Sequence, residues 1–220
     1  GPGLTSDDEE RGTRLSLCRC SDKDEIPQIV REYHYRVAKS IQEKMKLQNL
    51  DIFTLTNQDL YNLAKRSWAS GDRMISAAFD YNYEAIFRAF KQFRYEEAII
   101  FGSNILDIIE KFEHTEKLQE ILRVHLLVVQ SKIILGLDAS SIDEMIEEAK
   151  LIVYKSDSLD KEHWNLVILN VEADAVIHYP GFFEKQREDI LEQINNVIQA
   201  SGNKSKFELL YASLSQIRLD

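Results

Sequence analysis

Histidine and cysteine, the side chains that most often act as bases, nucleophiles or soft metal ligands at neutral pH, are few in this sequence. The 220-residue chain contains five histidines, which are His34, His114, His125, His163 and His178. None of them stands in a His-Glu-x-x-His or Glu-x-x-His arrangement, the spacings that place metal ligands on one face of a helix. The histidine pattern therefore predicts neither a metal centre nor a cofactor held by one.

Two histidines have neighbours that suggest a role. Asp174 and His178 are four residues apart and can share one face of a helix, a spacing that is more often a surface or capping contact than a pair of metal ligands. His125 stands in the apolar run between Leu122 and Val128, which favours a hydrogen-bonded histidine in a core or interface over a catalytic base. Both arrangements are more typical of structure than of catalysis.

The nucleophiles and phosphate-binding loops of common enzymes are missing as well. Cys18 and Cys20 could supply two thiolates, but no second pair of ligands follows, so we interpret them as thiols of a terminal arm. No serine stands in a Gly-x-Ser-x-Gly elbow, and no Gly-x-x-x-x-Gly-Lys loop occurs. We therefore expect no enzymatic activity and, with two cysteines and no apolar leader, a reducing, cytoplasmic (intracellular) setting.

Charge is unevenly distributed along the chain. The net charge of −10 and the pI near 5.1 should repel nucleic-acid phosphates in general. Between residues 65 and 94, however, basic residues outnumber acidic ones; the basic residues are Lys65, Arg66, Arg73, Arg88, Lys91 and Arg94. A solvated helix surface explains such a cluster, and a basic face for a small molecule or nucleic acid is the functional alternative.

Helices must position these residues, because Gly and Pro are scarce and apolar residues recur at steps of three and four. The pattern predicts an all-α protein with about nine helices and no convincing strand pair. The helices are expected to begin near residues 25, 56, 72, 95, 115, 141, 160, 183 and 205. The candidate N-terminal caps are Thr56, Asp72, Thr115, Ser141, Ser158 and Asp160.

The same pattern divides the chain into an arm and one helical domain. Residues 1–23 are acidic and polar, lack a period and begin with Gly1-Pro2-Gly3, which resembles the scar of a cleaved tag. Residues 24–220 form the predicted domain, with an N-terminal helix and connector at 24–55 and paired helices at 56–220. No apolar run approaches the roughly 20 residues that span a bilayer, so no membrane association is expected.

The segment Tyr95–Ile99, with the sequence YEEAI, resembles the opening of the second helix in tetratricopeptide repeats. Counting back, Asn82, Ala85, Ile86 and Ala89 occupy the positions where that repeat keeps Trp, Leu, Gly and Tyr, so the Trp, the Gly and the Tyr are replaced. Later helix pairs are offset by about 43 residues, longer than the roughly 34 of a standard unit and closer to other solenoid families.

This resemblance covers residues 56–220, is strongest over 80–112, and implies an α-solenoid of stacked antiparallel hairpins. In the frame of that repeat, one side of the first helix of a hairpin faces a concave groove. The residues placed there are Asp80, Tyr83, Phe87, Phe90 and Lys91. Aromatic rings beside cations suit a peptide, which they hold by stacking and by pairing with carboxylates. Alternatively, these aromatic side chains belong to the core.

Residues Ile26–Tyr33, with the sequence IPQIVREY, resemble the segment that links a winged-helix region to helical repeats in signal-transduction NTPases. That resemblance implies the alternative function, a sensor domain or transcription-regulator fragment that recognises a small molecule or nucleic acid. The leading prediction is a non-enzymatic scaffold or regulatory adaptor, part of a larger protein, that binds a protein or peptide. We expect no cofactor, nucleic acid is the less favoured partner, and self-association into a homo-oligomer stays open.

Overall fold

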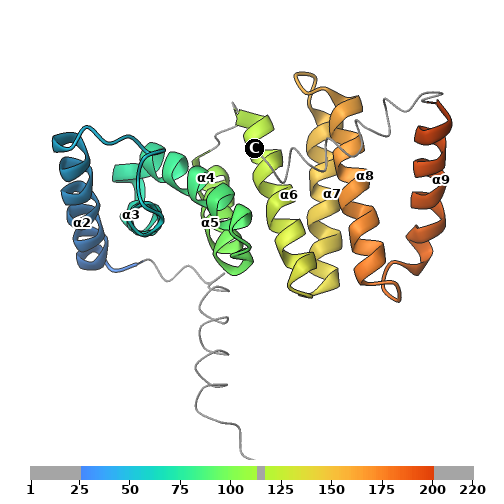
Figure 1. The fold of residues 1–220 in the computed structure, drawn as a ribbon, viewed down its shortest axis with the longest axis horizontal. Coiled ribbons are helices and arrows are strands. Elements are labelled where there is room, and N and C mark those ends of the chain that lie inside the picture. The colour runs from blue at the N-terminus through green and yellow to red at the C-terminus, as the bar shows by residue number, and fades with distance from the viewer. Residues whose placement is uncertain (1–25, 113–116, 201–220) are drawn as a thin grey trace, which may run out of the picture.

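The structure is a computed structural model that describes residues 26–112 and 117–200. Within these residues the backbone forms eight α-helices, one 3-10 helix and no strand, so the all-α prediction is confirmed (Figure 1). The helices are α2 (Gln28–Leu47), α3 (Asn57–Ala69), η1 (Gly71–Met74), α4 (Ile75–Lys91), α5 (Tyr95–Phe112), α6 (Leu118–Ile134), α7 (Ala139–Lys155), α8 (Lys161–His178) and α9 (Glu184–Ala200). The N-terminal arm, the expected cap Thr115 and the helix expected at 205–218 lie outside the described residues. None of the described helices is both long and apolar enough to cross a bilayer.

Side-chain caps explain where two of the helices begin. The Thr56 hydroxyl accepts a hydrogen bond from the backbone N–H of Asp59 at 3.2 Å at the start of α3. The Asp160 carboxylate accepts one from the backbone N–H of His163 at 3.1 Å at the start of α8. Each bond satisfies a donor that has no partner within the helix, and both caps are the ones that the sequence predicts.

Two helices begin differently from the expectation. The cap of α7 is Asp138, whose carboxylate accepts from the backbone N–H of Ser141 at 3.1 Å, so Ser141 lies inside the first turn. Helix α4 begins at Ile75 because the preceding residues form the 3-10 turn η1, which opens with a positive φ of 69° at Gly71. Asp72 belongs to that turn and is not the cap of α4.

The helices stack in chain order as antiparallel hairpins, in a solenoid-like array (Figure 1). Each described helix packs against the next one, and alternate helices also meet. Helix α4 contacts α6 and α6 contacts α8, while α3 contacts α5. A hydrogen bond of 3.0 Å from Gln42 Nε2 of α2 to the Tyr81 hydroxyl of α4 adds α2 to the series of even-numbered helices that contact one another. Helices α4, α6 and α8 begin at residues 75, 118 and 161, the even spacing of about 43 residues that the sequence predicts.

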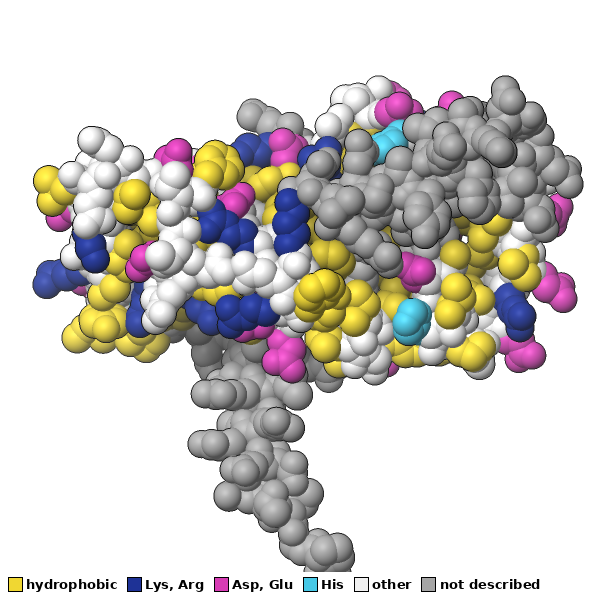
Figure 2. Space-filling model, in the orientation of Figure 1, with side chains coloured by type: hydrophobic (Ala, Val, Ile, Leu, Met, Phe, Trp, Pro, Cys, Tyr) yellow, Lys and Arg dark blue, Asp and Glu magenta, His cyan; other side chains and the backbone are white. Residues whose placement is uncertain are grey.

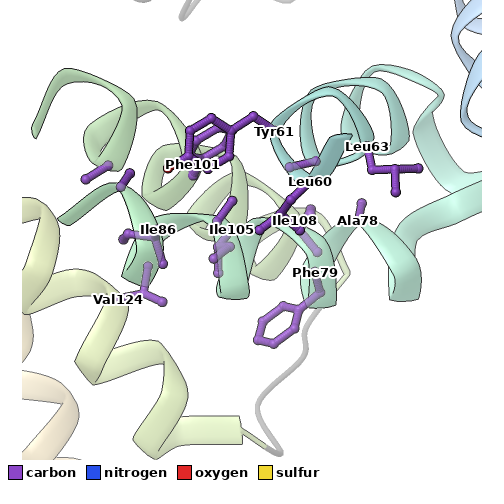
Figure 3. Packing of buried hydrophobic residues seen from close by; sticks show 14 of the residues in the cluster. Leu60, Tyr61, Leu63, Ala78, Phe79, Ile86, Phe101, Ile105, Ile108 and Val124 are labelled. Atoms are coloured by element: carbon purple, nitrogen blue, oxygen red, sulfur yellow. The ribbon is translucent and has the colours of Figure 1, made fainter. Parts of the chain in front are cut away.

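Two hydrophobic cores meet at α6. The first lies among α2 to α6, and Figure 3 shows its central part, where Leu60, Phe79, Ile86, Ile105 and Val124 converge from four helices. The second lies among α6 to α8 and the α8–α9 turn; α6 supplies Leu122, Leu126, Val129 and Ile133. Because α6 is buried on both sides, its sequence is apolar nearly all round instead of amphipathic.

A buried pair of asparagines links α3, α4 and α5. Asn82 donates from Nδ2 to the backbone carbonyls of Ala64 and Ala78, at 3.0 and 2.7 Å. Its side-chain oxygen accepts a hydrogen bond of 2.9 Å from Asn104 Nδ2. This polar network of two asparagines therefore lies within the core that α3, α4 and α5 share.

Helices α5 and α6 approach each other closely at Gly102. A Cβ atom added to Gly102 would lie 2.2 Å from Cγ2 of Val128 in α6 and 2.9 Å from Cδ1 of Ile86 in α4. Val128 is β-branched and buried, so it has little freedom to move away. The absence of a side chain at Gly102 therefore determines how closely α4, α5 and α6 can pack.

We expect Gly102→Ala to lower the free energy of unfolding. Overpacking costs about 1–3 kcal/mol, more than the roughly 1 kcal/mol that Ala gains over Gly inside a helix. Gly181→Ala is the control, because nothing lies within 4 Å of the added Cβ atom there. Urea denaturation of both variants checks the prediction, and equal stabilities would contradict the close contact at Gly102.

Candidate functional site

The histidine with the most apolar surroundings, His125, is a structural residue of the core. It is 3% exposed, and its Nε2 donates a hydrogen bond of 2.8 Å to the backbone carbonyl of Met145 in α7. Glu148 lies 3.7 Å from the same nitrogen. Burial lowers the pKa of His125, and the contacts with Met145 and Glu148 oppose that shift only in part. This geometry matches the hydrogen-bonded core histidine expected from the sequence.

His178 contacts the backbone of Asp174 near the end of α8. Nδ1 of His178 donates to the backbone carbonyl of Asp174 at 2.8 Å, a contact within the last turns of α8. Across residues 26–112 and 117–200, no group of three or more His, Cys, Asp or Glu side chains is placed to hold a metal ion.

The residues of the sequence-predicted basic face contact several different neighbours. Lys65 lies over the ring of Phe101, 5.8 Å from its centroid. Arg66 NH1 donates to Nδ1 of His34 at 3.0 Å. Arg94, just before α5, pairs with Glu97 in the first turn of that helix and also lies over the ring of Tyr61. The structure therefore does not gather Lys65, Arg66 and Arg94 on the surface of α4 that carries Asp80 and Lys91.

Arg88 of the same predicted face is a structural clamp. Its guanidinium donates to the backbone carbonyls of Ile52, Phe53 and Leu55, at 2.8, 2.9 and 2.6 Å. Its Nε donates to Glu84 at 2.7 Å. The three bonds to carbonyls tie the connector between α2 and α3 to α4. Together the four bonds use four of the five N–H donors of Arg88.

The five residues expected to bind a peptide fall into two groups. Asp80 and Lys91 are exposed on α4, and Tyr83 and Phe87 are half-buried at the border of that surface. Phe90 is only 7% exposed and packs against Tyr95, with ring centroids 5.4 Å apart. Phe90 thus lies in the core, the alternative that the sequence left open, whereas the other four reach the surface.

Three rings form an aromatic row along α4. Phe79 stacks on Tyr83 with centroids 5.9 Å apart, and Tyr83 meets Phe87 edge-on at 5.0 Å. The steps of four residues put the three rings on one side of the helix. Burial raises the pKa of Tyr83, and the guanidinium of Arg123 in α6 beside its hydroxyl opposes that shift. The row therefore borders α6.

Cations stacked on rings join consecutive even-numbered helices. Lys117, just before α6, lies 4.3 Å above the centroid of Phe79 and 3.7 Å from the Asp80 carboxylate, both in α4. Arg73, just before α4, likewise lies 5.0 Å above the centroid of Tyr35 and pairs with Glu32, both in α2. The same combination of cation, ring and carboxylate thus occurs at two successive junctions.

Sequence reasoning missed these contacts, although a signal was present. The interval from Arg73 to Lys117 equals the interval from Tyr35 to Phe79, as expected for equivalent positions of a repeat. Recognising it requires comparing side chains one repeat apart, at the interval of about 43 residues that the expected helix starts indicate.

We define the α2–α4–α6 face as the surface made by the exposed side of α4 and its borders with α2 and α6. Tyr35, Tyr81, Tyr83 and Phe87 are half-buried on it. Its cations are Lys39, Arg73, Lys91, Lys117 and Arg123, and its carboxylates include Glu32, Asp80 and Glu84. Glu84 forms an ion pair with Arg88, and Asp80 forms one with Lys117. Half-exposed rings next to exposed cations are the main chemical feature of this face.

No family model, curated protein sequence or solved structure matches this chain. The tetratricopeptide resemblance stays a prediction. The array of hairpins agrees with a helical-repeat arrangement, but the interval of about 43 residues between the starts of α4, α6 and α8 is longer than the roughly 34 of a tetratricopeptide unit.

We expect Lys117→Ala and Arg73→Ala each to lower the free energy of unfolding by roughly 0.5–1 kcal/mol, the contribution of an exposed cation–π contact. Lys155→Ala is the control, because Lys155 is exposed at the end of α7. Chemical denaturation measures all three. If the two junction variants were no less stable than the control, the cations would not hold the helices together.

His125 should make stability depend on pH. Its folded-state pKa lies below the value of about 6.5 for an unfolded histidine, so the unfolded chain binds more protons as the pH falls through that range. The free energy of unfolding should therefore decrease below about pH 6.5. His125→Gln keeps a donor for the Met145 carbonyl but cannot be protonated, and it should flatten the profile. Denaturation curves measured between about pH 7.5 and 5.5 give the free energy of unfolding at each pH. An equally steep decrease of that free energy in the wild type and in His125→Gln would contradict the prediction.

Proposed function

We propose that this chain is a non-enzymatic helical-repeat module, tetratricopeptide-like in organisation, that binds a protein or peptide through the α2–α4–α6 face. The observation that carries the proposal is the aromatic row Phe79–Tyr83–Phe87, which borders exposed cations of α4 and α6. A scaffold or regulatory adaptor requires such a surface and no catalytic group.

The physical reason is the low entropic cost of binding to a surface that is already ordered. Tyr83 is fixed between Phe79 and Phe87, and Tyr81 is held by the hydrogen bond from Gln42. Aromatic side chains with few rotatable bonds dominate the binding energy of many interfaces, and holding them in place before binding increases affinity. Neighbouring cations add charge-assisted hydrogen bonds to carboxylates or carbonyls.

A second candidate function is a sensor module for nucleic acid or an anionic small molecule. It is favoured by the eleven basic residues against seven acidic ones in residues 26–94. Arg88 and Arg94 of that region, however, already bind neighbouring groups of the chain. We therefore place this function second.

Selection of a random peptide library on the immobilised full chain tests the proposal. Enriched peptides should lose at least about tenfold in affinity, or about 1.4 kcal/mol, for the double variant Phe87→Ala with Lys91→Ala. The matched control is Tyr154→Ala with Lys155→Ala, which also removes one aromatic and one lysine but from α7, where Tyr154 is 80% exposed. No enrichment, or an equal loss in both double variants, would refute binding at this face.

A further inference from the structure

The two ends of the described array carry opposite charge. Residues 26–94, which form α2, α3 and α4, contain eleven basic and seven acidic residues. Residues 95–200 contain nine basic and 21 acidic residues. On the face shown in Figure 2, most of the Lys and Arg side chains lie in the left half, over α2 to α5. A protein with a net charge of −10 thus has a positive end, where an acidic ligand is attracted, and a negative remainder that repels it.

Three of the five cations that define the α2–α4–α6 face lie over rings of the protein. Arg73 and Lys39 lie over Tyr35, at 5.0 and 6.0 Å from its centroid, and Lys117 lies over Phe79. Arg123 lies beside Tyr83. A cation that rests on a ring loses less conformational freedom when it binds a carboxylate than one extended into solvent.

From this arrangement we propose that the partner of the α2–α4–α6 face is an extended, acidic segment of another protein, in which acidic residues alternate with apolar ones. This inference rests on the proposed function and specifies its ligand. The cations take the acidic side chains, and Tyr81, Tyr83 and Phe87 take the apolar side chains between them.

Geometry sets the spacing in such a ligand. Packed helices lie about 8–10 Å apart, and an extended chain advances about 3.3 Å per residue. Helices α4 and α6 are in contact, so cations on these two helices match acidic residues about three positions apart, or a multiple of that. Beyond α6, residues 135–200 contain five basic and 14 acidic residues, which favours a ligand that runs across α2, α4 and α6 over one that continues towards α9.

Fluorescence anisotropy with three labelled peptides tests the proposal. The first peptide repeats Glu-Glu-Leu-Phe. In the second peptide Gln replaces each Glu, and in the third Lys replaces each Glu. We expect the full chain to bind the Glu peptide at least about tenfold more tightly than the Gln peptide. The affinity for the Glu peptide should fall steadily as the salt concentration rises from about 50 to 300 mM. The Lys peptide should not bind.

Charge-reversal variants locate the site. The triple variant Lys39→Glu, Lys91→Glu and Arg123→Glu should lose the preference for the Glu peptide. The matched control reverses two lysines and one arginine on exposed positions of α7 and α9: Lys155→Glu, Lys185→Glu and Arg187→Glu. Circular dichroism and melting curves check the fold of both. Arg123→Gln alone, which removes one charge without adding another, should weaken binding in the same direction if the triple variant unfolds.

The outcomes distinguish failure of the acidic-ligand proposal from failure of the proposed peptide-binding function. If library peptides bind at Phe87 but the Glu and Gln peptides bind equally, the acidic ligand is refuted and the binding function stands. If no peptide binds at all, both fail. If a single-stranded oligothymidine binds more tightly than the Glu peptide and competes with it, the ligand is a nucleic acid and the proposal is overturned. An equal effect of both triple variants would refute the location.

Discussion

Helix α6 is buried on both flanks, and the rest of the array depends on that burial. Val124, Leu127 and Val128 complete the core that α6 shares with α4 and α5, while Leu126 and Ile133 begin the next one. One hairpin partner can bury only one apolar flank of a helix, so a helix with two such flanks requires neighbours before and after it. The stacking of hairpins is therefore a consequence of which side chains α6 must keep from water.

Stacking leaves the surface between successive even-numbered helices for polar contacts. At two of these junctions a cation lies on a ring of the preceding helix and pairs with a carboxylate next to it, Lys117 with Phe79 and Asp80, and Arg73 with Tyr35 and Glu32. The same side chains that hold neighbouring units together thus also form an ordered surface of rings and cations. The proposed binding role uses the same groups as the stacking of the helices, because both need aromatic side chains that are held in a fixed position.

Much of the fold could be predicted from local signals. Thr56 and Asp160 cap their helices because a cap depends on contacts within four residues. The burial of His125 followed from its apolar neighbours on the same helix. The start of α7 was placed too late, since both Asp138 and Ser141 are good caps and the choice between them depends on how the preceding turn packs. The start of α4 was also missed, because the positive φ of Gly71 made room for a 3-10 turn.

Sequence by itself determined that this protein is all helical and that its helices pair, because these properties depend on the spacing of nearby residues. Only the tertiary structure decided which rings are core and which are surface. Phe87 and Phe90 are both apolar and three residues apart, yet Phe90 packs on Tyr95 while Phe87 continues the row that borders α6. The carbonyl partners of Arg88 and the partners of Arg73 and Lys117 were equally undecided, because they lie 33 or more residues away along the chain. Contacts between helices are set by packing, which no local pattern records.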